Sequence, residues 1–341
     1  MTFEFKNCIK AYQEASKKGL KTAMATLVAL NGSSYRKPGV MMLIVEDGST
    51  VGAVSGGCVE KEILRQSVAV FETREPKIMT YDGRYRLGCE GTLFILIEPF
   101  NPSDEFIVKF ENALEKRKSF YLKTFYSKQE RGNANGGSFI LFENKKLIGF
   151  RKEQILEKTE RTNFLVFEQK FAPCFRLLVV GSEHDAEQLS LFASFLGWEV
   201  VVVTNATNQK VVSDFPGVHQ LIHVEPNQLS LNWINEQTAI VFMTHSYAKD
   251  LQYLLAVKGT SPCYIGLLGP NSRREKLMND LIEQYPEVEV SFLDKMYGPA
   301  GLNIGAETSQ EIALSICSEI LSVTRQQQPD FLKNKLTSIH S

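Results

Sequence analysis

Short apolar runs alternate with helical stretches in the second half of this sequence, and this alternation restricts the fold more than any other feature. The run FRLLVV at Phe175–Val180 is almost continuously apolar, and EVVVV at Glu199–Val203 follows after a helical stretch. Runs of this kind are typical of strands buried on both faces of a parallel sheet. Further strands are predicted at His219–Val224, Ala239–Thr244 and Cys263–Leu268. Because parallel strands need crossover connections, the pattern predicts a Rossmann-like, doubly wound parallel sheet domain.

The first half has a different pattern, in which helices and antiparallel strands are mixed. Helical spacing of apolar residues predicts a helix over Phe5–Lys18, and Asp47-Gly48 between two apolar runs predicts a hairpin. A chain of 341 residues is long enough for about two domains. We therefore expect an α/β protein with an α+β domain at residues 1–172, the Rossmann-like domain at 173–325 and a polar tail at 326–341.

Composition excludes several classes of function. Lys and Arg total 38 against 39 Asp and Glu, so the net charge is −1 and no basic surface for nucleic acid is expected. No apolar run reaches the ~18 residues of a membrane span, and the N-terminal MTFEFKNCIK has charges inside its apolar stretch, unlike a signal peptide. The six cysteines are scattered without a CxxC pair, which is typical of reduced thiols. We expect a cytoplasmic protein that binds neither nucleic acid nor membrane.

The turn after the first strand of the Rossmann-like half departs from the dinucleotide-binding pattern. Gly181 and Ala186 match the first and third positions of G-x-G-x-x-G/A, but Glu183 occupies the second. A carboxylate at that position adds bulk and repels a pyrophosphate. The second strand ends in Thr204-Asn205, without the acidic residue that binds a ribose hydroxyl. Gly181 stays a candidate cofactor-binding residue, but the pattern argues against NAD(P).

Polar groups follow later strands of this half, at the carboxyl edge where open α/β sheets bind ligands. His245 ends the fourth strand and is a candidate ligand-binding residue, with a local helix cap as an equal alternative. Arg273 and Arg274 lie in Ser272–Glu275, which fits a capping box, and arginines beside free helical N–H groups suit an anion. A solvated first turn is at least as good an interpretation. The histidines show no convincing metal-ligand spacing, so no metal site is predicted.

Three loops of the first half concentrate glycines, hydroxyls and thiols. Cys58 follows Gly56-Gly57 at a predicted helix N-terminus, where the macrodipole stabilises a thiolate. Cys89 is flanked by glycines and follows two arginines, so it ranks first as a reactive thiol and Cys58 second. Each loop alone is more typical of a turn than of a site, but the three together favour chemistry, and the other four cysteines are expected to be structural. The candidate cofactor-binding residues of these loops are Gly32, Ser33, Ser34, Tyr35, Arg36, Ser55, Gly56, Gly57 and Gly88.

These loops and several segments of the second half resemble the XdhC/CoxI family, the accessory proteins of xanthine dehydrogenase and related molybdenum hydroxylases. The resemblance spans both domains and departs from the family pattern at two places. GSEHDA stands where the family usually has GAGHVG, and Glu90 stands where a glycine is usual. The segments that carry the resemblance are GSSYRKPG at Gly32–Gly39, SGGCVE at Ser55–Glu60, GCEG at Gly88–Gly91, Met243–His245, YIGLLG at Tyr264–Gly269, RREKL at Arg273–Leu277 and AGLNIGAET at Ala300–Thr308.

The resemblance implies a protein that binds molybdenum cofactor, supports its sulfuration and inserts it into a xanthine dehydrogenase-type hydroxylase. It implies a chaperone rather than a turnover enzyme, with a cysteine desulfurase as a further partner and a homodimer as the assembly. In this interpretation Cys89 or Cys58 meets the metal, because thiolates suit soft metal centres. Two alternatives stay open: an NAD(P)-binding oxidoreductase, and a docking protein that bridges desulfurase and hydroxylase without binding the cofactor.

Overall fold

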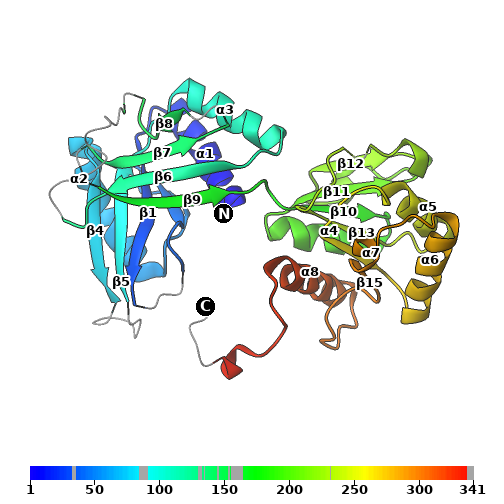
Figure 1. Ribbon diagram of the computed structural model, residues 1–341. Coiled ribbons are helices and arrows are strands. Elements are labelled where there is room, and N and C mark those ends of the chain that lie inside the picture. The colour runs from blue at the N-terminus through cyan, green and yellow to red at the C-terminus, as the bar shows by residue number, and fades with distance from the viewer. Residues whose placement is uncertain are drawn as a thin grey trace. The chain divides into compact units, whose positions relative to one another are not determined.

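The computed structural model describes residues 1–32, 36–83, 91–129, 133, 135–143, 146–152, 154, 164–230 and 232–335. Its contacts divide the chain into two compact units. The first comprises Met1–Pro173 together with the C-terminal residues from Phe331 onward, and the second comprises Cys174–Asp330. Figure 1 shows the helices and strands of each unit, coloured from blue at the N-terminus to red at the C-terminus.

A five-stranded antiparallel sheet forms part of the first unit, in the order β3-β2-β1-β5-β4. Its strands are β1 (Thr22–Asn31), β2 (Met41–Val45), β3 (Thr50–Gly52), β4 (Lys77–Asp82) and β5 (Thr92–Pro99). β1 pairs with β2 on one side and with β5 on the other, so strands that are distant in sequence are neighbours. The antiparallel pair β2–β3 confirms the predicted hairpin, and Gly48 in its turn has a φ of +88°, which glycine adopts without strain.

The helix α2 (Gly57–Thr73) covers one face of this sheet. Val59, Ile63 and Val70 lie on its inner side and are buried against residues of β1, β4 and β5. Their spacing in the sequence places them on one helical face. Full burial of each such side chain stabilises the fold by about 1.5–3 kcal/mol. The sheet therefore holds α2 firmly, including the end that carries Cys58.

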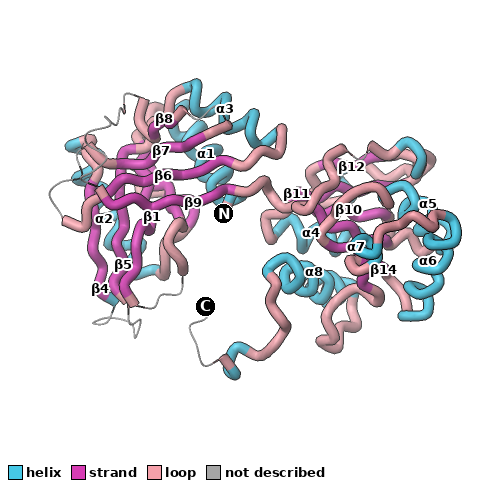
Figure 2. The backbone as a smooth tube through the Cα atoms, viewed as in Figure 1, coloured by secondary structure: helices cyan, strands magenta, loops and turns pink. Residues whose placement is uncertain are grey.

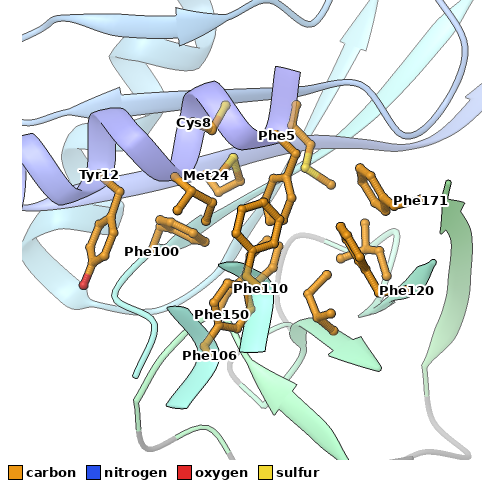
Figure 3. Close-up of a cluster of buried hydrophobic side chains, with 14 of the residues drawn as sticks. Phe5, Cys8, Tyr12, Met24, Phe100, Phe106, Phe110, Phe120, Phe150 and Phe171 are labelled. Atoms are coloured by element: carbon orange, nitrogen blue, oxygen red, sulfur yellow. The ribbon is translucent and has the colours of Figure 1, made fainter. Parts of the chain in front are cut away.

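A four-stranded antiparallel sheet and two more helices complete the regular structure described in Met1–Pro173. In the order β8-β7-β6-β9, its strands are β6 (Phe120–Tyr126), β7 (Gly137–Leu141), β8 (Leu147–Gly149) and β9 (Leu165–Phe171), and the helices are α1 (Thr2–Lys17) and α3 (Asp104–Glu115). Figure 3 shows a cluster of phenylalanine rings between these elements. Phe5 meets Phe110 edge to face at 5.4 Å, and Phe120 stacks on Phe171 at 5.0 Å. Aromatic pairs in these geometries add about 0.5–1.5 kcal/mol beyond burial.

The second unit is built on a six-stranded parallel sheet in the order β12-β11-β10-β13-β14-β15. Its strands are β10 (Arg176–Val180), β11 (Glu199–Thr204), β12 (Gln220–His223), β13 (Thr238–Phe242), β14 (Tyr264–Leu267) and β15 (Met296–Tyr297). Numbered along the chain, this is the strand order 3-2-1-4-5-6 of a Rossmann fold. All neighbouring strands are parallel, which confirms the predicted doubly wound sheet. Figure 2 shows these strands in magenta.

Helices pack on both faces of the parallel sheet. α4 (His184–Phe195) and α8 (Ser309–Arg325) share one apolar core with it, and α5 (Tyr247–Val257), α6 (Asn271–Gln284) and α7 (Val290–Leu293) share the other. Short 3-10 segments are η3 (Val212–Asp214) and η4 (Pro226–Gln228) in this unit and η5 (Leu332–Asn334) near the C-terminus. Among the described residues, every helix is too short or too polar to span a bilayer.

Two details of the second unit differ from the sequence predictions. α6 begins at Asn271 with Pro270 as its N-cap residue, so Ser272 lies inside the helix and the predicted capping box is wrong. Proline has a fixed φ that suits the start of a helix. The helix therefore begins just after Pro270, earlier than the capping-box pattern predicts. The sixth strand, β15, has only two residues, too few to produce a recognisable run of apolar residues.

Candidate functional site

The strand directions of the five-stranded sheet bring three loops to one end of it. β1 ends there and β5 begins there, with Asn31 opposite Thr92, and Asp82 at the end of β4 lies opposite Thr92 on the other side. β3 runs parallel to β1 with β2 between them, so the chain leaves β3 in the direction of this end, although Gly52 itself is level with Ala25 of β1. The loops that follow β1, β3 and β4 are the three that the sequence predicts as a site. We call this end of the sheet the loop edge.

Several predicted site residues lie outside the residues that the structure describes, and their roles stay predictions. They are Ser33, Ser34, Tyr35, Gly88 and Cys89. The described members of the loop edge are Gly32, Arg36, Ser55, Gly56, Gly57 and Cys58.

The start of α2 exposes backbone and a thiol together. Gly56 is the N-cap residue, with an extended φ of −133° and no side-chain cap, and Cys58 is exposed in the first turn. A Cβ built on Gly56 or Gly57 would meet no atom within 4 Å, and neither residue has a positive φ. The local fold therefore does not require glycine at these two positions. Glycine does allow a ligand to approach the free N–H groups at the start of the helix.

Glu60, one turn into α2, holds this loop in place. Its Oε1 accepts hydrogen bonds from the backbone N–H groups of Val54 at 3.0 Å and Ser55 at 2.7 Å. Glu60 is part of the SGGCVE segment, but the sequence analysis gave it no role at the site. One sequence feature could have predicted this role. An acidic residue in the first turn of a helix often accepts hydrogen bonds from N–H groups that precede the helix.

Arg36 links two loops of the loop edge to each other. Its Nη1 donates to the carbonyl oxygen of Ala53 at 3.0 Å and lies 3.9 Å from Glu4 Oε1 of α1. At least part of its guanidinium is thus engaged in holding the loop before α2. Gly32, immediately after β1, has a φ of +88°, so the turn itself favours glycine there.

Cys58 differs from the other cysteines in exposure. Cys8, Cys174 and Cys317 are buried and Cys263 is half-buried. Burial raises the pKa of Cys8 and of Cys263 to about 11 and the pKa of Cys317 to about 12. Thiols with such pKa values hold almost no thiolate near neutral pH, and the thiolate is the reactive and metal-binding form. Of the five cysteines that the structure describes, Cys58 is therefore the one open to a ligand.

The crevice at the carboxyl edge of the parallel sheet is small and several of its polar groups bind one another, although the buried Oδ1 of Asn205 has no partner among the described residues. Thr204 Oγ1 donates to Ser182 Oγ at 3.3 Å, and Asn208 Nδ2 donates to the same oxygen at 2.8 Å. The hollow that these residues line together with Glu183 has a volume of about 100 Å³. Small-molecule sites usually have about 300–1,000 Å³. This geometry adds a steric argument against a dinucleotide to the one from Glu183.

Gly181, the first glycine of the turn before α4, is required by the fold. Its φ is +137°, and a Cβ there would lie 2.4 Å from the carbonyl oxygen of Met243. Close packing of the turn against the end of β13 explains this glycine without a ligand. His245 also has a positive φ of 56°, and its Nε2 lies 3.7 Å from Asp185 Oδ2 of α4.

Asp250, at the start of α5, joins two of the predicted segments. Its buried carboxylate accepts from Thr244 Oγ1 at 2.6 Å and from Arg273 Nη2 at 2.8 Å. The structure thus brings Thr244, beside His245, together with Arg273. Arg274 instead packs its side-chain carbons against Gly298. The sequence pattern assigned Asp250 no role, because its partners come from loops far apart in the chain.

Both units match sequence models of known protein families. The sequence model described as the XdhC and CoxI family matches residues 15–82, and the model described as the XdhC Rossmann domain matches residues 177–320. The chain belongs to the XdhC and CoxI family. The first match contains the loop edge with Cys58, and the second contains the parallel sheet, so the resemblance predicted from the motifs is confirmed.

Relatives of this XdhC/CoxI protein match over nearly their full length. A protein of Bacillus subtilis (strain 168) that is named as a probable xanthine dehydrogenase subunit is 28% identical, over 90% of this chain and 94% of the relative. The molybdenum cofactor insertion chaperone PaoD of Escherichia coli (strain K12) is 24% identical, over 97% and 92%. A crystal structure described as a xanthine dehydrogenase from Bacillus halodurans superimposes with a TM-score of 0.77 at 26% identity, covering 96% of this chain and 98% of that chain.

Proposed function

We propose that this protein binds molybdenum cofactor and inserts it into a molybdenum hydroxylase of the xanthine dehydrogenase type. One observation carries the proposal: the loop edge places an exposed thiol, Cys58, beside two glycines that the fold does not need. The relatives support it, since one is named a molybdenum cofactor insertion chaperone and another a probable subunit of xanthine dehydrogenase.

The chemistry of the cargo suits the loop edge. Molybdenum cofactor carries a phosphate, a hydrogen-bonding pterin and a metal held by sulfur. Free N–H groups at the start of α2, beside Gly56 and Gly57, form a ready site for the phosphate. Cys58 contributes a soft sulfur ligand for the metal. Glu60 keeps the loop in the geometry that presents these groups.

Further features belong to the same proposal. Cys89 and the hydroxyl residues Ser33, Ser34 and Tyr35 are proposed to contribute to cofactor binding at the loop edge. A cysteine desulfurase is the proposed source of sulfur while the cofactor is held. The protein is proposed to act as a cytoplasmic homodimer and to release its cargo to the hydroxylase.

The test is retention and delivery of the cofactor. Wild type, Cys58→Ala, Cys89→Ala and the control Cys263→Ala are incubated anaerobically with molybdenum cofactor and desalted, and bound molybdenum and pterin are quantified. We expect the first two variants to retain less cofactor and to activate less apo-hydroxylase, while the control in the second unit behaves as wild type. Normal retention and delivery by both Cys58→Ala and Cys89→Ala would contradict the role given to these thiols.

The same preparations distinguish the alternatives. Calorimetric binding of NAD(P) with no affinity for molybdenum cofactor would favour an oxidoreductase. Stable complexes with both desulfurase and hydroxylase in the complete absence of cofactor retention would favour a docking protein.

A further inference from the structure

A hollow of about 220 Å³ lies at the end of the five-stranded sheet opposite the loop edge. β1 begins and β5 ends there, and the C-terminal ends of α1 and α2 form its sides. We call it the α1–α2 hollow. Cys58, near the start of α2, lies twelve residues before Val70, the first residue of that helix to line the hollow, which is about 18 Å at 1.5 Å per residue. The hollow is therefore distinct from the site proposed for the cofactor.

The walls of the α1–α2 hollow are aromatic and well ordered by packing. Phe71 of α2 lines it together with Tyr12 and Phe100, which are buried. The Tyr12 and Phe100 rings meet edge to face at 5.2 Å, and Tyr12 Oη donates to Asn101 Oδ1 at 3.1 Å. Because Asn101 uses its oxygen for Tyr12, its amide N–H₂ remains a donor for a guest. Apolar walls with a few placed polar groups are typical of small-molecule sites, and a volume below the usual ~300–1,000 Å³ limits the guest to about a single ring.

Two cations, Lys21 and Arg74, line the same hollow. Within the part of the chain that the structure describes, no carboxylate lies within ion-pair distance of either side chain. The C-terminal ends of α1 and α2 contribute roughly −0.5 charge each, and Glu46 Oε1 accepts from the backbone N–H of Lys21 at 2.8 Å, so the nearby charges roughly balance. Lys17 in the last turn of α1 already offsets part of that helix's negative end. An anionic guest would give the side chains of Lys21 and Arg74 the ion-pair partner that they lack among the described residues.

We propose that the α1–α2 hollow is a second ligand site, which binds a small aromatic or heteroaromatic anion. The ring packs against Phe71 and the Tyr12–Phe100 pair, and the carboxylate or phosphate lies with Lys21 and Arg74. The amide of Asn101 donates to the ring or its substituent. Tight binding needs both the ring and the anionic group. An apolar ring without charge leaves the cations unpaired, and an anion without a ring leaves the aromatic wall exposed to water.

Phenyl phosphate and benzoate are the probes, with inorganic phosphate and cyclohexanecarboxylate as matched compounds that lack one feature. Binding is followed on the full chain by NMR titration with tyrosine and phenylalanine labelled. We expect saturable binding of at least one aromatic anion, and about tenfold weaker binding in Arg74→Gln and Lys21→Gln, since each substitution removes a charged hydrogen-bond donor to the anion. Lys118→Gln, which changes a lysine at a different hollow of the same unit, is expected to leave the affinity unchanged.

Several results would overturn the proposal. They are the absence of saturable binding by either aromatic anion, equal affinity for inorganic phosphate, and an equal loss of affinity in Lys118→Gln. Because Lys21 and Arg74 are exposed, their substitution leaves the core intact, and unchanged thermal unfolding of each variant verifies this. Cofactor retention by the same variants is measured separately, so failure here leaves the function of the loop edge unaffected.

Discussion

Gly57 in the first unit and Gly181 in the second both lie where the chain enters a helix at the edge of a sheet, yet their surroundings differ. Gly181 has a positive φ and faces the carbonyl oxygen of Met243 at a distance that no Cβ tolerates. Gly57 has neither constraint, and a side chain there would extend into open space. The fold therefore explains why Gly181, in the Rossmann turn, is a glycine, but it does not explain why Gly57 is one. A glycine that the fold does not explain is the better evidence for a ligand.

The polar groups at the two edges show the same contrast. In the second unit, Asp250 is satisfied by Thr244 and Arg273, and Ser182 is satisfied by Thr204 and Asn208. These groups are committed to holding loops together. At the loop edge, the Cys58 thiol and the N–H groups of Gly57 and Cys58 have no such partner among the described residues, while the N–H of Val59 bonds to the carbonyl oxygen of Gly56. We infer that the crevice of the second unit is largely structural and that the loop edge is available for chemistry.

The largest effect is expected for Asp250→Ala. Removing this buried carboxylate leaves Arg273, whose side chain is 23% exposed, without its ion pair, and frees the Thr244 turn. Loss of one partner of a buried pair costs about 3–5 kcal/mol, and the partial exposure of Arg273 places this case near 3 kcal/mol. Both tryptophans, Trp198 and Trp233, belong to the second unit, so urea unfolding followed by tryptophan fluorescence measures this unit selectively. Glu283→Ala on the exposed side of α6 is the control, and equal midpoints for both variants would contradict the structural role of Asp250.

Gly181→Ala should destabilise the second unit by about 2 kcal/mol or more. A non-glycine residue in the left-handed region costs about 1–2 kcal/mol, and the contact with Met243 adds to that cost. Tryptophan fluorescence in urea again measures it. Gly259→Ala, at a position in the same unit with open space and no positive φ, should unfold as wild type. If the two variants unfold alike, the fold does not require Gly181 and a ligand becomes the better explanation for it.

Buried carboxylates extend the comparison to the first unit. Glu98 on β5 is fully buried, and Oε2 accepts from the backbone N–H of Ser138 at 2.9 Å while Oε1 has no partner among the described residues. Burial raises the pKa of Glu98 above its ordinary 4.5, although the charge of Arg151 acts in the opposite direction. The surroundings of Glu98 therefore favour proton binding more than those of an exposed glutamate do, because its pKa is raised.

Glu98→Gln tests this through the pH dependence of stability. For a group whose folded pKa is raised, the stabilising contribution is complete below the unfolded value and is lost as pH rises through the folded pKa. Wild type should therefore lose stability relative to Glu98→Gln as pH increases from about 4.5, the ordinary glutamate value. Calorimetric unfolding of the first unit at several pH values measures the difference. Parallel curves for the two proteins would show that Glu98 titrates normally.

The fold of the second unit was largely predictable, because strands buried on both faces leave nearly continuous apolar runs such as Arg176–Val180 and Thr238–Phe242. The loop edge was predictable only in pieces. Each loop shows its glycines and thiols in the sequence, but their convergence depends on the pairing of β1 with β5, across a long stretch of intervening chain. Glu60 and Asp250 were missed for a related reason, since their roles consist of contacts that form only after folding.

The smallest effect on stability is expected for Gly57→Ala, although its effect on cofactor binding should be clear. Alanine is a better helix former than glycine, and the Cβ at the first position of α2 meets nothing within 4 Å. The free energy of unfolding of the first unit should stay unchanged or rise by less than about 1 kcal/mol.

The same methyl group projects toward the space where a ligand would approach the helix N-terminus, so molybdenum cofactor retention should fall in Gly57→Ala. Gly259→Ala, which also adds a methyl group in open space but far along the chain in the second unit, is the control and should retain the cofactor normally. A Gly57→Ala protein with normal stability and normal retention would remove the distinction drawn between the two glycines. Lower retention at unchanged stability would show that Gly57 serves the ligand rather than the fold.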